Sequence, residues 1–175
     1  MNVLIIGCGG REHAVAKKLN CNLFYYGSHS NPGLDKIATK VDTITSNYDL
    51  VFIGPEKYLE EGLVDKLTCD CIGPTKELAR IETSKLFCRN FLHKHCPEVN
   101  PKYYYNIDDL VYLLDELEEY VIKYDGLKGG KGVFVKGDHF DEDIQAISIC
   151  KNLDNFIIEE KLYGEEFSLM SFCDG

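Results

Sequence analysis

Short apolar runs alternate with segments of helical spacing through residues 1–85, and this alternation limits the possible fold more than any other feature of the chain. Four runs have the length and composition of strands: residues 2–6, 23–26, 49–53 and 69–72. A loop rich in glycine, proline or serine follows each run, and helical spacing follows three of these loops, as in residues 59–67. Strands that alternate with helices predict a doubly wound parallel sheet.

The first of these loops, residues 7–10, contains three glycines and a cysteine and leads into a helix near Arg11. It places backbone N–H groups at a helix N-terminus, where they favour an anion. The loop resembles a dinucleotide-binding fingerprint, but Glu12 stands where the third glycine belongs, and no acidic residue ends the second strand. A smaller phosphorylated ligand therefore fits better than NAD or FAD. A purely structural turn is the alternative.

Two more loops follow strands at the same expected edge of the sheet. Residues 27–33 are rich in serine, asparagine, proline and glycine, and residues 54–56 read Gly-Pro-Glu. Open parallel sheets bind ligands in a crevice at the carboxyl ends of their strands. We expect the loops 7–13, 27–33 and 54–56 to line one crevice.

A second candidate site lies in residues 120–135, where two apolar runs flank a loop of glycines and lysines. Glycine lets backbone amides approach an anion closely, and Lys123, Lys128 and Lys131 supply positive charge. A Walker-type loop is excluded, because aspartate and glycine occupy positions where it requires glycine and Ser or Thr. The pattern favours a hairpin that closes over nucleotide phosphates. An ordinary surface hairpin with solvated lysines is the alternative.

The rest of the second half predicts antiparallel strands with helices. Thr83 and Ser84 are expected to cap a helix that begins at Lys85, and the turn-rich residues 96–101 indicate a domain boundary nearby. Asn106 is expected to cap a helix over residues 107–117, with Asp109 completing a capping box. Three further elements are expected: a helix that begins at residues 141–143, a strand over 155–160 and a last strand over 167–173.

Composition narrows the classes of partner. The formal net charge is −10 and the basic residues are scattered, which argues against nucleic acid as the main partner. The eight cysteines form no C-x-x-C pair, and the group His93, His95 and Cys96 has no common zinc spacing. No apolar run reaches membrane-spanning length, and the N-terminus lacks the features of a signal sequence. We expect a cytoplasmic chain that binds no membrane.

Several segments together resemble one family, phosphoribosylamine–glycine ligase of the ATP-grasp superfamily. The sequence VLIIGCGGREH at residues 3–13 resembles the opening motif of that family. Shorter motifs follow in the family's order at residues 31–33, 54–56, 73–75 and 84–85. Residues 121–133 resemble its lid hairpin and residues 158–168 its hinge, so the resemblance covers nearly the whole chain.

The resemblance implies an α/β fold with an N-terminal doubly wound parallel sheet and part of an ATP-grasp domain with an antiparallel lid. The implied boundaries are a substrate-binding domain over 1–75, the start of the ATP-grasp domain over 76–118, the lid over 119–163 and a return strand over 164–175. Family members continue well beyond this length, and their later part carries the magnesium ligands and much of the glycine site. We therefore expect an N-terminal portion of a longer enzyme, or a shortened relative, with little activity alone.

The implied activity is an ATP-dependent carbon–nitrogen ligation in purine biosynthesis. ATP phosphorylates the carboxylate of glycine, and the amine of 5-phosphoribosylamine attacks the acyl phosphate to give glycinamide ribonucleotide, ADP and phosphate. The implied cofactors are ATP and Mg²⁺ or Mn²⁺, and fusion to or association with other purine-pathway domains stays open. The alternatives are another ATP-grasp carboxylate–amine ligase, which the Gly-Gly-Arg-Glu-His stretch disfavours, and a non-catalytic nucleotide-binding module.

The resemblance also implies the site residues, although it assigns neither a catalytic residue nor a metal ligand to this chain. Lys85 and Lys123 would contact the phosphates of ATP, and Glu159 would accept a hydrogen bond from the adenine amino group. The backbone near Leu162 would pair with the ring edge, and Glu166 would bind the ribose. The implied ATP-binding residues are Lys85, Lys123, Gly129, Gly130, Lys131, Gly132, Glu159, Glu160, Leu162 and Glu166. The implied phosphoribosylamine-binding residues are Gly9, Gly10, Arg11, Glu12, His13, Asn31, Gly33, Pro55 and Glu56.

One position departs from the family. Members usually carry small residues where this lid reads Lys128-Gly129, so the loop holds an additional charge. Glu159 and Glu166 also have a simpler interpretation, because carboxylates at strand ends are more often solvated than bound to ligands. Their spacing around Leu162 favours the nucleotide interpretation.

Overall fold

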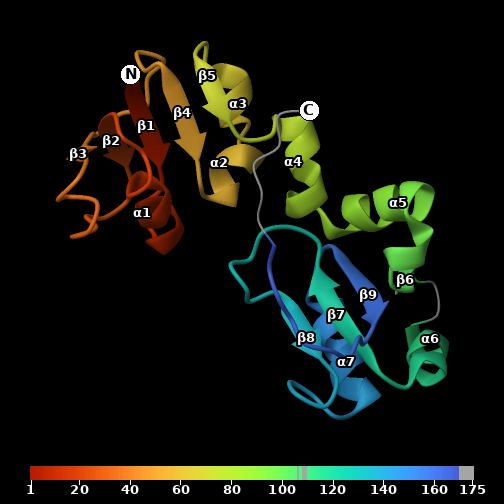
Figure 1. Cartoon of the computed structure of the whole chain (residues 1–175). Helices are drawn as coiled ribbons and strands as arrows, with labels where there is room; N and C mark the ends of the chain where they lie inside the picture. The colour runs from red at the N-terminus through yellow and green to blue at the C-terminus, as the bar shows by residue number, and fades with distance from the viewer. Residues whose placement is uncertain (106, 108–109, 170–175) are drawn as a thin grey trace. The chain divides into compact units, whose positions relative to one another are not determined.

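The computed structural model describes residues 1–105, 107 and 110–169 of the 175-residue chain (Figure 1). The chain divides into two compact units, Met1–Cys88 and Arg89–Gly175. Within the described residues, no helix has both the length and the apolar character needed to cross a membrane.

The first unit is built on a five-stranded parallel sheet with the strand order β3-β2-β1-β4-β5 (Figure 1). Its strands are β1 (Asn2–Ile6), β2 (Asn22–Tyr26), β3 (Thr39–Lys40), β4 (Leu50–Ile53) and β5 (Asp70–Ile72). The predicted parallel sheet is confirmed, and β3 is an additional strand too short for the sequence pattern to reveal. The strand order changes direction between β1 and β4, and such a switch point is where open α/β sheets bind ligands.

Strand β1 is buried on both faces of this sheet. One set of its alternating residues packs with α1 (Gly10–Ala16), and the other set packs with α2 (Glu56–Glu60) and α3 (Leu63–Lys66). A strand covered on both faces carries a continuous apolar run instead of an alternating one. The sequence of β1 has this property, and the doubly wound arrangement is the reason.

The helical segment predicted over residues 59–67 is wrong as a single element. It is divided between α2 and α3, and Gly62 between them has a φ angle of 71°. Glycine adopts this left-handed conformation without steric cost, so the chain can break there while its apolar residues keep their spacing. Helix α4 (Lys76–Thr83) follows, and α5 (Lys85–His95) begins after Ser84, whose Oγ accepts a hydrogen bond from the Phe87 N–H at 3.1 Å. The predicted Ser84 cap is therefore confirmed.

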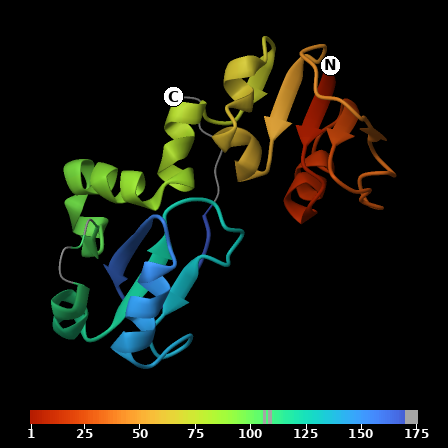
Figure 2. The same ribbon diagram turned by 180° about the vertical axis from the view of Figure 1, so that it is seen from behind.

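The second unit holds a four-stranded antiparallel sheet with the order β6-β9-β7-β8. The strands are β6 (Tyr103–Tyr104), β7 (Tyr120–Tyr124), β8 (Val133–Val135) and β9 (Phe156–Glu160). Helices α6 (Leu110–Leu117) and α7 (Asp143–Lys151) contribute to the apolar cluster on one face, and Figure 2 shows α7 in front of the strands. A short 3-10 helix, Pro97–Val99, precedes β6. The predicted hairpin and the strand over residues 155–160 are confirmed.

Two predictions concern residues of uncertain placement. The cap at Asn106 with its partner Asp109 lies outside the described residues. The strand predicted over residues 167–173 is described only as far as residue 169, and residues 167–169 are not a strand. A strand requires a neighbour for its hydrogen bonds, and no described strand pairs with these three residues.

Candidate functional site

A cavity of about 540 Å³ lies in the first unit at the carboxyl ends of its strands. All three loops that the sequence predicted to meet contribute to its wall. The lining residues are Gly7, Cys8, Gly9, Gly10, Arg11, Glu12, Gly27, Ser28, Pro55, Glu56, Lys57 and Tyr58. The cavity has the size and position of a small-molecule site, and phosphoribosylamine binding there remains a prediction.

Arg11 connects the first and third loops. Its Nη1 donates to the backbone carbonyl of Gly54 at 2.9 Å and to Glu56 Oε1 at 3.0 Å. Both side chains of this ion pair are well exposed, so it contributes little to stability. The guanidinium therefore lies on the rim of the cavity, and its remaining N–H groups are donors suited to an anionic ligand.

Asn31 of the second loop connects that loop to the first. Its Nδ2 donates to the carbonyl of Cys8 at 2.9 Å, and its Oδ1 accepts from the N–H of Gly33 at 2.8 Å. Neither Asn31 nor Gly33 lines the cavity. The structure therefore places them where they shape the loops, and direct contact with a substrate remains a prediction.

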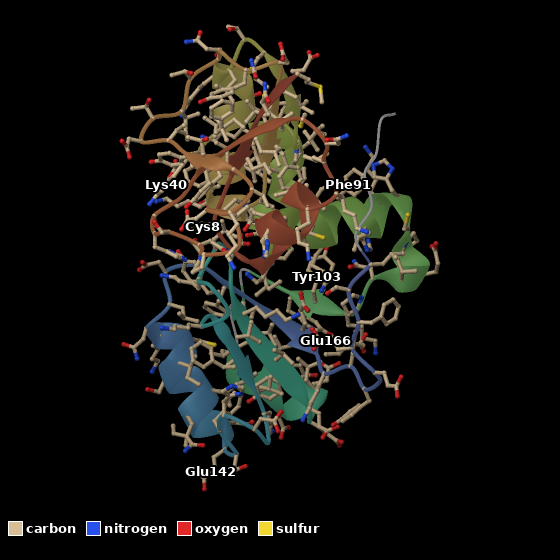
Figure 3. All side chains as sticks on the ribbon, turned by 60° about the vertical axis from the view of Figure 1, so that its left-hand side comes forward. Cys8, Lys40, Phe91, Tyr103, Glu142 and Glu166 are labelled. Carbon is tan, nitrogen blue, oxygen red and sulfur yellow. The ribbon has the colours of Figure 1, made fainter. Side chains whose placement is uncertain are left out.

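His13 lies against the second loop. A Cβ atom at Gly33 would be 2.3 Å from His13 Cε1, so the imidazole rests directly on the glycine. Cys8, labelled in Figure 3, has its Sγ 3.5 Å from a ring nitrogen of His29, a neighbour that the sequence pattern did not reveal. His13 also does not line the cavity, although it was predicted to bind substrate.

Glu12 is a buried carboxylate, 5% exposed. Its Oε2 accepts a hydrogen bond from the backbone N–H of Gly9 at 2.6 Å. Cβ atoms built at Gly7 or Gly54 would lie within 3 Å of its side chain. Glu12 therefore occupies space that these two glycines leave open, and this gives a structural reason for glycine at both positions.

In the second unit, the loop between β7 and β8 (residues 125–132, the lid loop) has a tight turn at its tip. The N–H of Lys131 donates to the carbonyl of Lys128 at 3.2 Å, and Gly129 and Gly130 have φ angles of 56° and 78°. Positive φ at both central residues defines a type I′ turn, which matches the twist of a hairpin. The glycines are thus required by the turn itself. Lys128 lies over the ring of Tyr124, with its Nζ 4.2 Å from the ring centroid.

Lys123 and Glu159 meet on the face of the second sheet opposite the apolar cluster that contains Ile122 and Ile158. Lys123 Nζ donates to Glu159 Oε2 at 2.5 Å. Arg89 of α5 reaches the same carboxylate, with Nε 2.6 Å from Oε1 and Nη2 3.0 Å from Oε2. The side chain of Glu159 is only 3% exposed, so a buried carboxylate is held by two cations.

The ionisation of Glu159 follows from these contacts. Burial by itself would raise the pKa of this carboxyl group, but hydrogen bonds from Arg89 and then from Lys123 outweigh burial and hold the pKa below its ordinary value. Glu159 is therefore an ionised acceptor. The interpretation of Glu159 as a solvated carboxylate at a strand end is wrong, because the side chain is buried and paired.

The remaining predicted nucleotide residues lie in several places. Glu160 points to the other face of β9 and accepts the backbone N–H of Lys102 at 2.9 Å. Leu162 is 68% exposed, and Glu166, labelled in Figure 3, is exposed in the segment that follows β9. Lys85 is the first residue of α5 and belongs to the first unit. Their contacts with a nucleotide stay predictions.

Sequence reasoning missed Arg89. Its partner Glu159 is 70 positions away in the sequence, and no short sequence pattern indicates that the two residues pair. The one available signal was its place one turn after Lys85 on the same helix, since residues four apart share a helix face.

The family models match both halves of the chain. The model described as phosphoribosylglycinamide synthetase, N domain, matches residues 1–82, and the model described as phosphoribosylglycinamide synthetase, ATP-grasp (A) domain, matches residues 83–175. A curated relative from Methanobrevibacter smithii, named phosphoribosylamine–glycine ligase, is 39% identical over 100% of this chain. The chain spans about half the length of such relatives, 47% in this case.

Solved structures agree with this result. A phosphoribosylamine–glycine ligase from Thermotoga maritima superposes with a TM-score of 0.72 and 27% identity, over 94% of this chain and 45% of that one. A carboxyaminoimidazole ribonucleotide synthase from Aspergillus clavatus, solved in complex with ATP, has a TM-score of 0.64 at 16% identity, over 93% of this chain and 47% of that one. The second similarity is one of fold alone.

Proposed function

The chain belongs to the phosphoribosylglycinamide synthetase family, and we propose from this premise that it supplies the phosphoribosylamine crevice and the nucleotide lid of an ATP-dependent ligase. The complete reaction joins glycine to 5-phosphoribosylamine through a glycyl phosphate and yields glycinamide ribonucleotide, ADP and phosphate. A cytoplasmic location fits such an enzyme of purine biosynthesis. The likeness to known ligases covers both units, and the chain spans about half the length of those ligases.

The observation that carries the nucleotide part of the proposal is the buried carboxylate of Glu159. Among the described residues, Oε2 accepts two hydrogen bonds and Oε1 accepts one. A carboxylate offers about four acceptor positions, so one remains on Oε1. The exocyclic amino group of adenine is a donor suited to it, whereas guanine presents an oxygen acceptor at the same place. The proposed site therefore selects ATP over GTP.

Lys123 supplies the positive charge that the phosphates require. Its ammonium group lies next to Glu159, and Lys123 is the last residue but one of β7, the strand that leads into the lid loop. Closure of the glycine loop over the phosphates would exclude water from an acyl phosphate, which otherwise hydrolyses. In the first unit, Arg11 at the rim of the cavity supports binding of the phosphate of phosphoribosylamine.

The described residues contain no ready-made cluster of ligands for the metal that the family implies. Among them, no three His, Cys, Asp or Glu side chains gather closely enough to hold an ion. Magnesium or manganese therefore enters no step assigned to these residues. The second candidate for the 175-residue chain by itself is a nucleotide-binding module without catalysis.

Lys123→Ala is expected to weaken ATP binding by the chain about tenfold or more, because a hydrogen bond to a charged group contributes about 1.5–3 kcal/mol. Isothermal titration calorimetry with ATP measures the change. Lys151→Ala, a change at an exposed lysine in the last turn of α7, removes the same charge and is expected to bind as the unmodified chain does. Equal affinity of the Lys123 variant and the control would contradict the proposed phosphate site.

A polypeptide of the relatives' full length tests the reaction. We expect it to release ADP only when ATP, glycine and 5-phosphoribosylamine are all present, as measured by a coupled ADP assay. The 175-residue chain is expected to show little or no turnover. ADP release at the same rate without glycine would overturn the ligase assignment.

A further inference from the structure

Arg89 holds the central carboxylate of the proposed nucleotide site without being one of the residues predicted to touch the nucleotide. Its two donors approach both oxygens of Glu159, at 2.6 Å and 3.0 Å. A guanidinium that binds a carboxylate through two parallel hydrogen bonds fixes its plane as well as its position. The side chain of Arg89 is 20% exposed, so the pair is largely shielded from water.

The segment around Arg89 is itself held in place. Asn100 Nδ2 donates to the backbone carbonyl of Arg89 at 3.1 Å, and Tyr103 on β6, labelled in Figure 3, is the cross-strand neighbour of Glu159. The hydroxyl of Tyr103 donates to Asn90 Oδ1 at 2.8 Å. The second part of α5 is therefore held against the edge of the sheet beside Glu159. The backbone that carries the guanidinium of Arg89 is fixed in position.

The charges of the three groups do not cancel. Glu159 carries one negative charge, whereas Arg89 and Lys123 each carry a positive one, so the cluster has a net charge of +1. Without Arg89, Glu159 and Lys123 would form a neutral pair. A polyphosphate is attracted by the net charge of the cluster, and this attraction is strong where water is excluded. Because Arg89 compensates the charge of Glu159, the positive charge of Lys123 can attract a phosphate.

We propose that Arg89 is a positioning residue of the nucleotide site with two effects. It neutralises Glu159, so that Lys123 remains available to phosphate, and it fixes the carboxylate plane, so that the remaining acceptor position on Oε1 faces a 6-aminopurine. The inference rests on the proposed function, because it assigns a role within that site. It extends that function by making base selectivity and phosphate affinity depend on a residue that need not contact the nucleotide.

Two substitutions at Arg89 separate the two effects. Arg89→Met removes both the positive charge and the pair of parallel hydrogen bonds to Glu159. Arg89→Lys keeps the charge but cannot form the two parallel hydrogen bonds of a guanidinium. We expect Arg89→Met to weaken ATP binding about tenfold or more and to reduce the ratio of ATP to GTP affinity. Arg89→Lys is expected to keep ATP affinity within about threefold while its ATP to GTP ratio falls. Lys94→Met removes the charge of an exposed lysine on the same helix and should change neither quantity.

Calorimetric titrations of the 175-residue chain and its variants with ATP and GTP provide the test, with circular dichroism to verify folding. A purely structural role for Arg89 would alter stability but not the ATP to GTP ratio of a folded variant. The inference is overturned if folded Arg89→Met or Arg89→Lys keeps the selectivity of the unmodified chain, or if Arg89→Lys loses as much ATP affinity as Arg89→Met. Absence of ATP binding by the unmodified chain itself would instead overturn the proposed function, and the inference with it.

Discussion

Glu159→Gln is expected to destabilise the second unit by about 2–4 kcal/mol, because removing one partner of a buried ion pair leaves the other charges uncompensated. Arg89 and Lys123 would then face each other at side-chain exposures of 20% and 25%, with no counter-ion between them. Glutamine keeps the shape of the side chain, but it removes the charge and replaces one acceptor oxygen with an NH2 donor. Urea unfolding followed by circular dichroism measures the loss.

Glu160→Gln is the matched control for this prediction. Glu160 is adjacent in β9, points to the opposite face and accepts one backbone N–H from Lys102, which a glutamine oxygen can also accept. Its substitution should shift the unfolding transition by no more than about 0.5 kcal/mol. An equal shift for both variants would show that the cluster around Glu159 does not stabilise the unit through its charge.

The destabilisation caused by Glu159→Gln is predicted to depend on pH. The pKa of Glu159 is lower in the folded chain than its ordinary value of 4.5, because Arg89 and Lys123 outweigh the effect of burial. A carboxyl group with a lowered pKa contributes stability that is fully present above its unfolded pKa and is lost as the pH falls through the folded value. The stability difference between the unmodified chain and Glu159→Gln should therefore be constant near neutral pH and shrink below about pH 4.5. Urea unfolding between pH 3 and pH 7 measures it, and a difference that grows on acidification would contradict the assignment.

Local sequence patterns predicted what depends on neighbouring residues. The apolar run at residues 2–6 predicted a strand of a parallel sheet, and the glycines around residue 130 predicted the loop of a hairpin. Patterns of this kind report side-chain spacing and turn chemistry, and both are properties of a short window. They do not report a backbone break such as Gly62, where the apolar spacing continues through a left-handed residue.

The site was predictable only in part, because its geometry comes from contacts between distant residues. The family motif identified Glu159 and Lys123, but the fork from Arg89 joins positions 70 apart. Asn31 was predicted to bind the substrate, which remains a prediction, and the structure adds that its amide joins the first two loops through hydrogen bonds. A motif tells which residues matter to a family and does not distinguish a residue that touches the ligand from one that shapes the loop beside it.

Gly54→Ala should destabilise the first unit by about 1–3 kcal/mol, a typical cost of inserting a methyl group into a packed site. The new Cβ would lie 2.0 Å from Glu12 Oε1 and 2.7 Å from its Cδ, so the carboxylate must move. Movement would break the hydrogen bond from the N–H of Gly9 and leave a buried acid without it. The φ angle of Gly54 is not in the left-handed region, so backbone strain is not the cause.

Gly10→Ala distinguishes this packing effect from the general effect of replacing glycine. Gly10 is the first residue of α1, and a Cβ atom there would meet no atom within 4 Å. Alanine restricts the unfolded chain and favours a helix, so Gly10→Ala should be neutral or more stable by up to about 1 kcal/mol. Urea unfolding of both variants gives the comparison. If Gly54→Ala were as stable as Gly10→Ala, the buried position of Glu12 would not depend on the glycine at residue 54, and the carboxylate would instead have room to turn toward the cavity.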